Sequence, residues 1–128
     1  MLYGEDDVSL PDKTTAHCLF CRIVRGDVPA DLLYRGERVL AFADIKPQAP
    51  VHILVIPKQH IGSVAELTAR HGSLMGEVML AARQVARDKG LEQTGYRLVV
   101  NTGADACQTV PHLHVHVIGG RAMAWPPG

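Results

Sequence analysis

The chain has 128 residues, 47% of them hydrophobic, which is enough for one compact core and too few for two comfortable domains. Its 13 Lys and Arg balance its 13 Asp and Glu, which argues against non-specific nucleic-acid binding because such binding needs a basic surface. The strongly apolar run at residues 53–56 is far shorter than the roughly 20 residues of a membrane helix. The acidic N-terminus fits neither a secretory signal nor a transit peptide, so we expect a soluble cytoplasmic protein without a membrane partner.

The first part of the chain predicts a tail, a short helix and three strands. Residues 1–15 are polar and are expected to form a flexible N-terminal tail. Residues 18–24 have partial helical spacing and predict a short helix. Two β-rich runs, 32–35 and 39–44, lie close enough together to predict a hairpin. A strongly apolar run at 51–56 predicts a buried strand.

The strongest helical pattern lies in the middle of the chain. Apolar residues recur at intervals of three and four across residues 63–89, which predicts one buried helix face. Ser63 and Glu66 have the spacing of a capping box, and Gly90 is a suitable C-terminal stop. The His71-Gly72 pair can break this helix into a short and a long piece.

The last part of the chain predicts two strands that flank a polar loop. The strands are expected at residues 96–101 and 112–118, and the loop at 102–111. Hairpins with a helix segregated from them indicate an α+β fold with a mostly antiparallel sheet. One long helix is expected to cover a face of that sheet.

The cysteine pattern leaves three interpretations open. The chain has three cysteines, and an odd number in a cytosolic protein does not indicate a disulfide framework. Cys18 and Cys21 form a Cys-x-x-Cys pair, which is typical of a redox pair or of half a zinc site. The residues before the pair look like a loop rather than the strand that a redox motif expects. Two incidental cysteines are the third interpretation.

Three histidines alternate with apolar residues near the C-terminus. On a strand, His112, His114 and His116 would share one face, because alternate residues point the same way. Such a row could chelate a catalytic zinc that binds hydroxide, or one imidazole could act as a nucleophile. Hydrogen-bond donors in the preceding loop, among them Gln108 and Thr109, suit an anionic phosphate. Neutral imidazole attacks phosphorus well near neutral pH. A loop that suits phosphate therefore favours a nucleophilic histidine over a catalytic zinc.

At this point the sequence resembles the histidine-triad (HIT) superfamily, and within it the Hint branch of nucleoside phosphoramidate hydrolases. The resemblance runs from Cys18 to Gly128, nearly the whole chain. It rests on His-Leu-His-Val-His-Val at 112–117, Asp-Ile-Lys-Pro-Gln-Ala-Pro at 44–50, His-Ile-Leu-Val-Ile-Pro-Lys at 52–58, Tyr-Arg-Leu-Val-Val-Asn at 96–101, Gly-Gly-Arg at 119–121 and Trp-Pro-Pro-Gly at 125–128.

The resemblance implies a fold and an assembly. It implies that residues 16–128 form a HIT domain of the α+β class. The sheet would have five mainly antiparallel strands, with one long and one short helix. The family is a homodimer that joins two such sheets into one continuous ten-stranded sheet. Trp125 would then reach the active site of the partner.

The resemblance also assigns catalytic roles. His114 matches the nucleophile that attacks the α-phosphorus and forms a nucleotidyl-histidine, from which water releases the nucleoside monophosphate. His116 matches the residue that hydrogen-bonds the phosphate oxygens, and His52 matches the fourth family histidine on the adjacent strand. His112 completes the row. Thr109 keeps the hydroxyl of the usual Ser. The implied catalytic set is thus His52, Thr109, His112, His114 and His116.

A purine nucleoside monophosphate or phosphoramidate is the implied ligand. Asp44 matches the carboxylate that binds both ribose hydroxyls, which suits one carboxylate and two vicinal OH groups. Ala43 departs from the pattern, because that position is often His in the branch. The base slot matches the apolar residues Leu19, Phe20, Ile23, Phe42 and Ile45. The remaining nucleotide contacts are expected from Asn101, Cys107, Gln108, Thr109, Val110, His114 and His116.

The resemblance favours zinc for the cysteine pair. Many bacterial members bind a structural zinc through Cys-x-x-Cys and two histidines, which match Cys18, Cys21, His60 and His112 here. This Cys₂His₂ set leaves no open position on a tetrahedral ion, so the zinc would be structural. No organic cofactor is implied. Cys107 departs from the family, which usually has Gly there; if the position needs a positive φ, Cys costs roughly 1–2 kcal/mol.

The sequence therefore predicts an enzyme, a purine nucleoside 5′-phosphoramidate hydrolase acting on a P–N bond. A dinucleoside polyphosphate hydrolase is the second enzyme hypothesis, and the ending Trp-Pro-Pro-Gly argues against it. A zinc-stabilised nucleotide-binding interaction module with residual hydrolase activity is the hypothesis from another class. A redox protein that uses Cys18 and Cys21 would leave the histidines without a role.

Overall fold

The structure, a computed structural model, describes residues 13–128. Most of the expected N-terminal tail, residues 1–12, lies outside the described residues. Residues 13–15 of that tail belong to a helical turn, α1 (Lys13–His17), which leads into α2 (Leu19–Arg25). Among the described residues no helix has the length and apolar character to cross a membrane.

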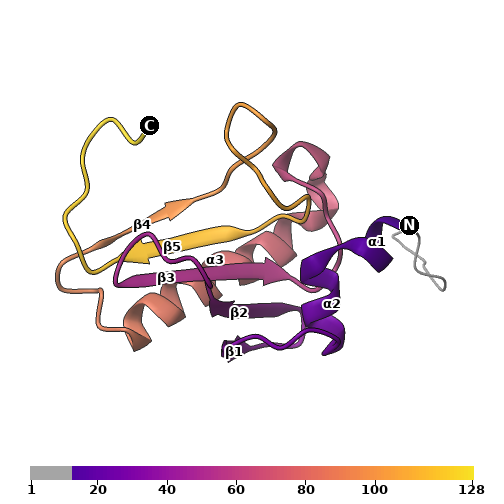
Figure 1. Ribbon diagram of the computed structural model, residues 1–128, viewed down its shortest axis with the longest axis horizontal. Helices are drawn as coiled ribbons and strands as arrows, with labels where there is room; N and C mark the ends of the chain where they lie inside the picture. The colour runs from indigo at the N-terminus through magenta and orange to yellow at the C-terminus, as the bar shows by residue number, and fades with distance from the viewer. Residues whose placement is uncertain (1–12) are drawn as a thin grey trace.

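The core of the molecule is one antiparallel sheet (Figure 1). Its strands lie in the order β1-β2-β3-β5-β4, and every neighbouring pair is antiparallel. The strands are β1 (Leu32–Arg35), β2 (Val39–Ala43), β3 (Val51–Pro57), β4 (Tyr96–Val99) and β5 (Val115–Gly119). The predicted α+β class, the hairpin of β1 with β2 and the buried strand β3 are confirmed.

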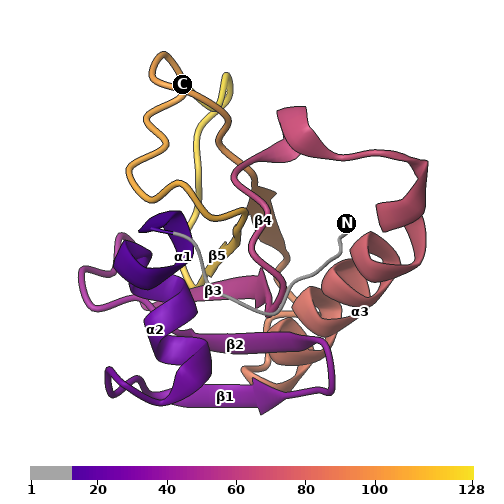
Figure 2. The same ribbon diagram turned by 90° about the vertical axis from the view of Figure 1, so that its right-hand side faces the viewer.

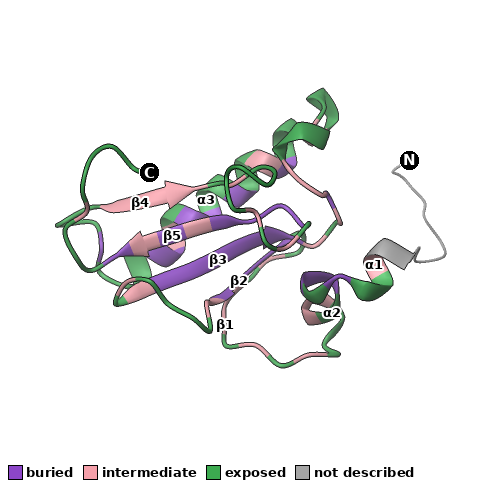
Figure 3. Ribbon diagram, turned by 45° about the horizontal axis from the view of Figure 1, so that its top comes forward, coloured by how far each residue is buried: buried purple, intermediate pink, exposed green. Residues whose placement is uncertain are grey.

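Both faces of the sheet are covered. The long helix α3 (Gly72–Asp88) packs on one face and the short helix α2 on the other (Figure 2). Because side chains alternate along a strand, β3 sends Ile53 and Val55 into the core beneath α3 and Leu54 and Ile56 into the core beneath α2. Strands β2 and β3 are accordingly buried along nearly all their length (Figure 3).

The short helix begins at a cysteine and ends at a glycine. Cys18 is its N-cap, with extended backbone, and the Cys18 Sγ accepts the backbone N–H of Cys21 at 3.4 Å. Gly26 ends the helix with a φ of 83°, a left-handed conformation that glycine adopts without steric cost. The predicted helix is confirmed, one residue later at each end, and its first turn carries the Cys-x-x-Cys pair.

The expected helix over residues 63–89 is α-helical only in its second part. Two 3₁₀ turns, η1 (Val64–Glu66) and η2 (Ala69–His71), precede α3, so the break falls at His71-Gly72 as predicted. Ser63 caps the first turn through the Ala65 N–H, and Glu66 accepts the N–H of Gly62. Thr68 then caps a new turn, because its hydroxyl accepts the backbone N–H of Arg70 and its own backbone N–H donates to His71 Nδ1.

The last strand is shorter than predicted, because β5 begins at Val115 and not at His112. The backbone N–H of His112 bonds the carbonyl of Val110, and that of Leu113 bonds the carbonyl of Ile61, so this stretch pairs with loops. The alternation nevertheless continues through it. Leu113, Val115 and Val117 lie in the core under α3. The three histidines therefore lie on the α2 side of the sheet, so they share one face, as the sequence predicted.

Candidate active site

A cavity of about 240 Å³ lies between α2 and the sheet. Ten residues expected to hold a nucleotide line it: Leu19, Phe20, Ile23, Phe42, Asp44, Ile45, Thr109, Val110, His114 and His116. Sequence reasoning missed five further lining residues: Val28, Pro29, Ala30, Ala43 (noted only as a family departure) and Leu54. The alternation along β3 puts Leu54 on the α2 side, and that signal could have found it. The turn at 28–30 carries no pattern that would have.

Three expected ligand contacts do not line the cavity: Asn101, Cys107 and Gln108. The Gln108 amide donates to the carbonyls of Gly62 and Val110 at 2.8 and 3.1 Å, and its oxygen accepts the N–H of Gly103. Gln108 therefore holds the loop together. Cys107 is exposed and has a φ of 65°, the positive value that glycine would adopt more readily.

His114 is held in one tautomer by the backbone. Its Nδ1 lies 2.7 Å from the carbonyl oxygen of His112, and a carbonyl can only accept, so Nδ1 carries the proton. The neutral ring then has its lone pair on Nε2. His114 is buried, lines the cavity, and packs against the Phe20 ring in a T-shaped contact with a centroid distance of 5.2 Å. These contacts hold the ring of His114 at the cavity wall with Nδ1 as its protonated nitrogen.

A second series of hydrogen bonds determines the tautomer of His116. The backbone N–H of Gln48 donates to His52 Nδ1 at 3.0 Å, so the neutral His52 carries its proton on Nε2. His52 Nε2 lies 2.8 Å from His116 Nδ1 and donates to it. His116 must then carry its proton on Nε2, which is buried and has no partner within the described chain. His116 also lines the cavity, so its unpartnered N–H is a candidate donor for a ligand oxygen.

Burial keeps this histidine pair neutral. It lowers the pKa of His116 to about 4, with smaller contributions from the neighbouring His114 and His52. Burial also lowers the pKa of His52, and the nearby carboxylate of Asp44 opposes that effect. At neutral pH both rings are therefore uncharged, and the hydrogen-bond order from Gln48 to His116 is maintained.

Asp44 stands beside the pair. One of its oxygens accepts the Lys46 N–H at 2.8 Å, and the other lies 3.4 Å from His52 Nε2. Asp44, His52 and His116 bring three donor atoms within 4.8 Å of one another. They do not suit a metal, because an ion on His52 Nε2 would move the proton to Nδ1, where it would face the N–H of Gln48. The carboxylate remains available as an acceptor at the cavity.

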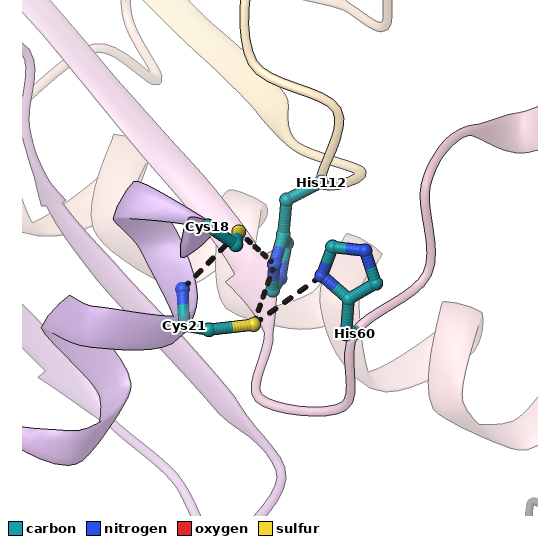
Figure 4. A group of neighbouring side chains, drawn as sticks. All are labelled: Cys18, Cys21, His60 and His112. Atoms are coloured by element: carbon teal, nitrogen blue, oxygen red, sulfur yellow. Dashed lines mark hydrogen bonds between the residues drawn. The ribbon is translucent and has the colours of Figure 1, made fainter. Parts of the chain in front are cut away.

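A separate cluster joins the cysteine pair to two histidines (Figure 4). Cys18 Sγ lies 3.4 Å from His112 Nδ1, and Cys21 Sγ lies 3.3 Å from His60 Nδ1 and 3.6 Å from His112 Nδ1. Tetrahedral zinc with ordinary Zn–S and Zn–N bonds sets sulfur and nitrogen about 3.6 Å apart. The four ligand atoms lie within 4.8 Å of one another. The donor set and its spacing thus fit zinc.

The backbone also sets the tautomer of His112. Its Nε2 lies 2.8 Å from the carbonyl of Pro57 and donates to it, so the Nδ1 lone pair faces the two sulfurs. Burial is the main cause that lowers the pKa of His112 to about 4. A neutral ring with an outer hydrogen bond is the form that ligates metals. The predicted quartet of Cys18, Cys21, His60 and His112 is therefore brought together and oriented as a ligand set.

Comparison with known proteins agrees with this geometry. The family model described as HIT domain matches residues 25–123. The chain is 52% identical over 110 residues to an uncharacterised HIT-like protein of Synechococcus elongatus, a match that covers 86% of this chain and 96% of that protein. It is 44% identical over 127 residues to the 14 kDa zinc-binding protein of Zea mays, covering 98% of each.

A solved structure shows the same fold. The crystal structure of a HIT family hydrolase from Legionella pneumophila matches with a TM-score of 0.86 and 43% identity, covering 88% of this chain and 100% of that one. The family match spans most of the chain, and these relatives align along nearly their whole length. The chain therefore belongs to the HIT domain family.

Proposed function

We propose that this protein is a purine nucleoside 5′-phosphoramidate hydrolase that works through a nucleotidyl intermediate on His114. One observation carries the proposal: the His112 carbonyl fixes the proton of His114 on Nδ1 and leaves Nε2 as the nucleophile at the cavity. The buried N–H of His116 at the same wall suits the oxygen of an attacked phosphorus. The hydrolase named among the structural relatives supports the reaction class.

The reaction follows in two displacements. His114 Nε2 attacks the α-phosphorus and forms a P–N bond, while the bond from phosphorus to the substrate nitrogen breaks and the leaving amine takes up a proton from solvent. Water then attacks the same phosphorus and returns a proton to solvent, the bond to His114 breaks, and the nucleoside monophosphate leaves. The His116 N–H stabilises the charge that develops on the phosphoryl oxygen in each step. Thr109 lies at the cavity wall, where its hydroxyl can bond the phosphate or the leaving group.

The cavity supports a nucleoside as the group on phosphorus. Its wall is largely apolar, with Phe20 and Phe42 in edge-to-face contact at 5.4 Å and Leu19, Ile23 and Ile45 beside them. Such a slot can hold the face of a purine. Asp44 keeps carboxylate lone pairs at the cavity, and these can accept both ribose hydroxyls.

We also propose that Cys18, Cys21, His60 and His112 hold a structural zinc. Four protein ligands fill a tetrahedral ion, so the metal would supply rigidity and would not bind substrate. The cluster geometry supports this proposal, and so does the name of the zinc-binding relative from maize. Catalytic chemistry then rests on the histidines.

A homodimer is the proposed assembly. Strand β4 lies at one edge of the sheet, and an unpaired edge can be extended by a second copy. Trp125 is 82% exposed in the single chain, which is unusual for an indole and suits contact with a partner. Sedimentation of the purified protein tests the assembly.

The function is tested by AMP release from adenosine 5′-phosphoramidate. His114→Asn removes the proposed nucleophile, and His17→Asn is the matched control because His17 is an exposed histidine that does not line the cavity. We expect His114→Asn to lose several orders of magnitude in kcat while His17→Asn keeps the wild-type rate. Thermal unfolding of both variants confirms folding. Equal slow rates in the wild type and His114→Asn would contradict the proposal and favour the nucleotide-binding interaction module.

A further inference from the structure

The series of hydrogen bonds that determines the tautomer of His116 extends beyond Gln48 to Arg121. The carbonyl of Gln48 accepts the Nε–H of Arg121 at 3.0 Å, across 73 positions of sequence. The N–H of the same residue holds His52 Nδ1 at 3.0 Å. His52 then donates to His116, whose own N–H lies buried at the cavity wall. Four residues thus form one directed chain that starts at an exposed arginine and ends at the reaction site.

The segment that carries Arg121 packs closely against the loop that contains Gln48. Gly120 has a φ of 92°, and a Cβ added there would lie 2.9 Å from the Cβ of Pro50. A side chain at this position would be strained and would displace Pro50, whereas glycine lets the chain turn tightly after β5. The turn brings Arg121 to the loop between β2 and β3, at residues 44–50, where Asp44 and Gln48 reside. The loop is held from outside by the chain that follows the histidine strand.

We propose that Arg121 is a positioning residue for catalysis, which holds the Gln48 amide so that His52 and His116 both keep their protons on Nε2. The proposal deepens the proposed function and rests on it, because it assigns a role to the His116 N–H at the phosphorus. Without the arginine, the carbonyl of Gln48 loses its partner and the loop is free to turn its amide away from His52. His52 Nδ1 then loses its donor, and only the Asp44 carboxylate, 3.4 Å from His52 Nε2, still favours the Nε2–H form. His116 therefore no longer presents a donor in every molecule.

Arg97 offers a matched control. It is a half-buried arginine of β4, it lines the same surface pocket as Arg121, and its guanidinium donates to the backbone carbonyl of Ala124 at 2.9 Å. Its side chain makes no hydrogen bond to Gln48, His52 or His116 in the part of the protein that the structure describes. Arg97→Met therefore removes a comparable side chain and a comparable hydrogen bond without disturbing the proposed relay.

The experiment reads the ring tautomers directly, by long-range ¹H–¹⁵N NMR of the imidazole nitrogens in the full-length protein, alongside kcat for adenosine 5′-phosphoramidate. The wild type and Arg97→Met should show the Nε2–H form at both His52 and His116. Arg121→Met should show mixed tautomers at His52 and a loss in kcat of about 10-fold, in the range for outer hydrogen-bond partners. Arg121→Lys should recover part of both, because an ammonium can donate to the Gln48 carbonyl.

A second route tests the same relay with Arg121 intact. Gly120→Ala should push Pro50 and the loop away and mix the tautomers in the same way. Unchanged tautomers at both histidines in Arg121→Met and in Gly120→Ala would overturn the proposal, whatever the activity. If the wild type has no hydrolase activity, the proposed function fails, and the tautomers still decide the role of Arg121.

Discussion

The carbonyl of His112 accepts the Nδ1–H of His114 at 2.7 Å, while the ring of His112 faces the two cysteine sulfurs. One residue therefore joins the proposed metal cluster to the proposed nucleophile. Its side chain is tied to Cys18 and its backbone sets the tautomer of the next histidine on the same side of the sheet. A change in the cluster that moves the His112 backbone must reach His114 Nδ1.

Loss of the metal cluster is expected to lower stability and activity together. In Cys21→Ser the zinc should bind far more weakly, and Tm should fall by roughly 10 °C, the shift that about 3 kcal/mol gives in a chain of this size. The value of kcat should fall as well, because His112 loses its orientation. Cys107→Ser is the matched control, since Cys107 is exposed and belongs to no cluster of metal-ligating side chains among the described residues.

Zinc content and thermal unfolding check this prediction. We expect one zinc per chain in the wild type and in Cys107→Ser, and much less in Cys21→Ser. Addition of a strong chelator to the wild type should reproduce the Tm of Cys21→Ser. A wild-type protein that carries no zinc and keeps its Tm in chelator would contradict the assignment.

Removal of the His116 donor is expected to slow the reaction without removing the nucleophile. His116→Leu deletes the buried N–H, and loss of one such donor costs about 10²-fold in kcat. His116→Gln keeps an N–H close to the position of Nε2 and should retain more activity than His116→Leu. Steady-state rates of the two variants, each checked by circular dichroism, make the comparison. Equal rates in both would mean that the N–H takes no part.

Stability should fall with acid because His116 is held neutral. Burial lowers its folded pKa from the ordinary 6.5 to about 4, so below pH 6.5 the unfolded chain binds a proton that the folded chain refuses. The free energy of unfolding therefore decreases as the pH falls from about 6.5 to 4. His116→Gln lacks this titration and should lose less stability across that interval. Urea unfolding of both proteins at several pH values measures the difference; identical slopes would contradict the prediction.

The sequence predicted most of the strands and the face of the sheet on which their side chains lie. It predicted little about the orientation of the histidine rings. Alternation placed Leu113 under α3 and the histidines on the other side, and this held although residues 112–114 pair with loops instead of a strand. The helix over 63–89 was wrong in its first part, because Ser63 and Thr68 each cap a separate turn and two caps cannot serve one helix.

The tautomers of the histidines could not be predicted from the sequence. They depend on which backbone groups reach the rings of His52, His112 and His114, and those groups come from Gln48, Pro57 and His112. No spacing pattern reports a hydrogen bond to a backbone carbonyl. The same limit applies to Gln108, which was expected at the ligand and instead bonds the carbonyls of Gly62 and Val110.

Cys107 gives the last prediction, because it is the only non-glycine residue with a positive φ among residues 13–128. Its φ of 65° costs an L-residue roughly 1–2 kcal/mol, and glycine removes that cost while adding some freedom to the unfolded chain. Cys107→Gly should therefore raise the free energy of unfolding by about 1 kcal/mol. Cys107→Ala removes the thiol and keeps the strain, so it should leave stability unchanged. Urea unfolding distinguishes the two variants, and an equal gain in both would place the cost in the thiol and not in the backbone.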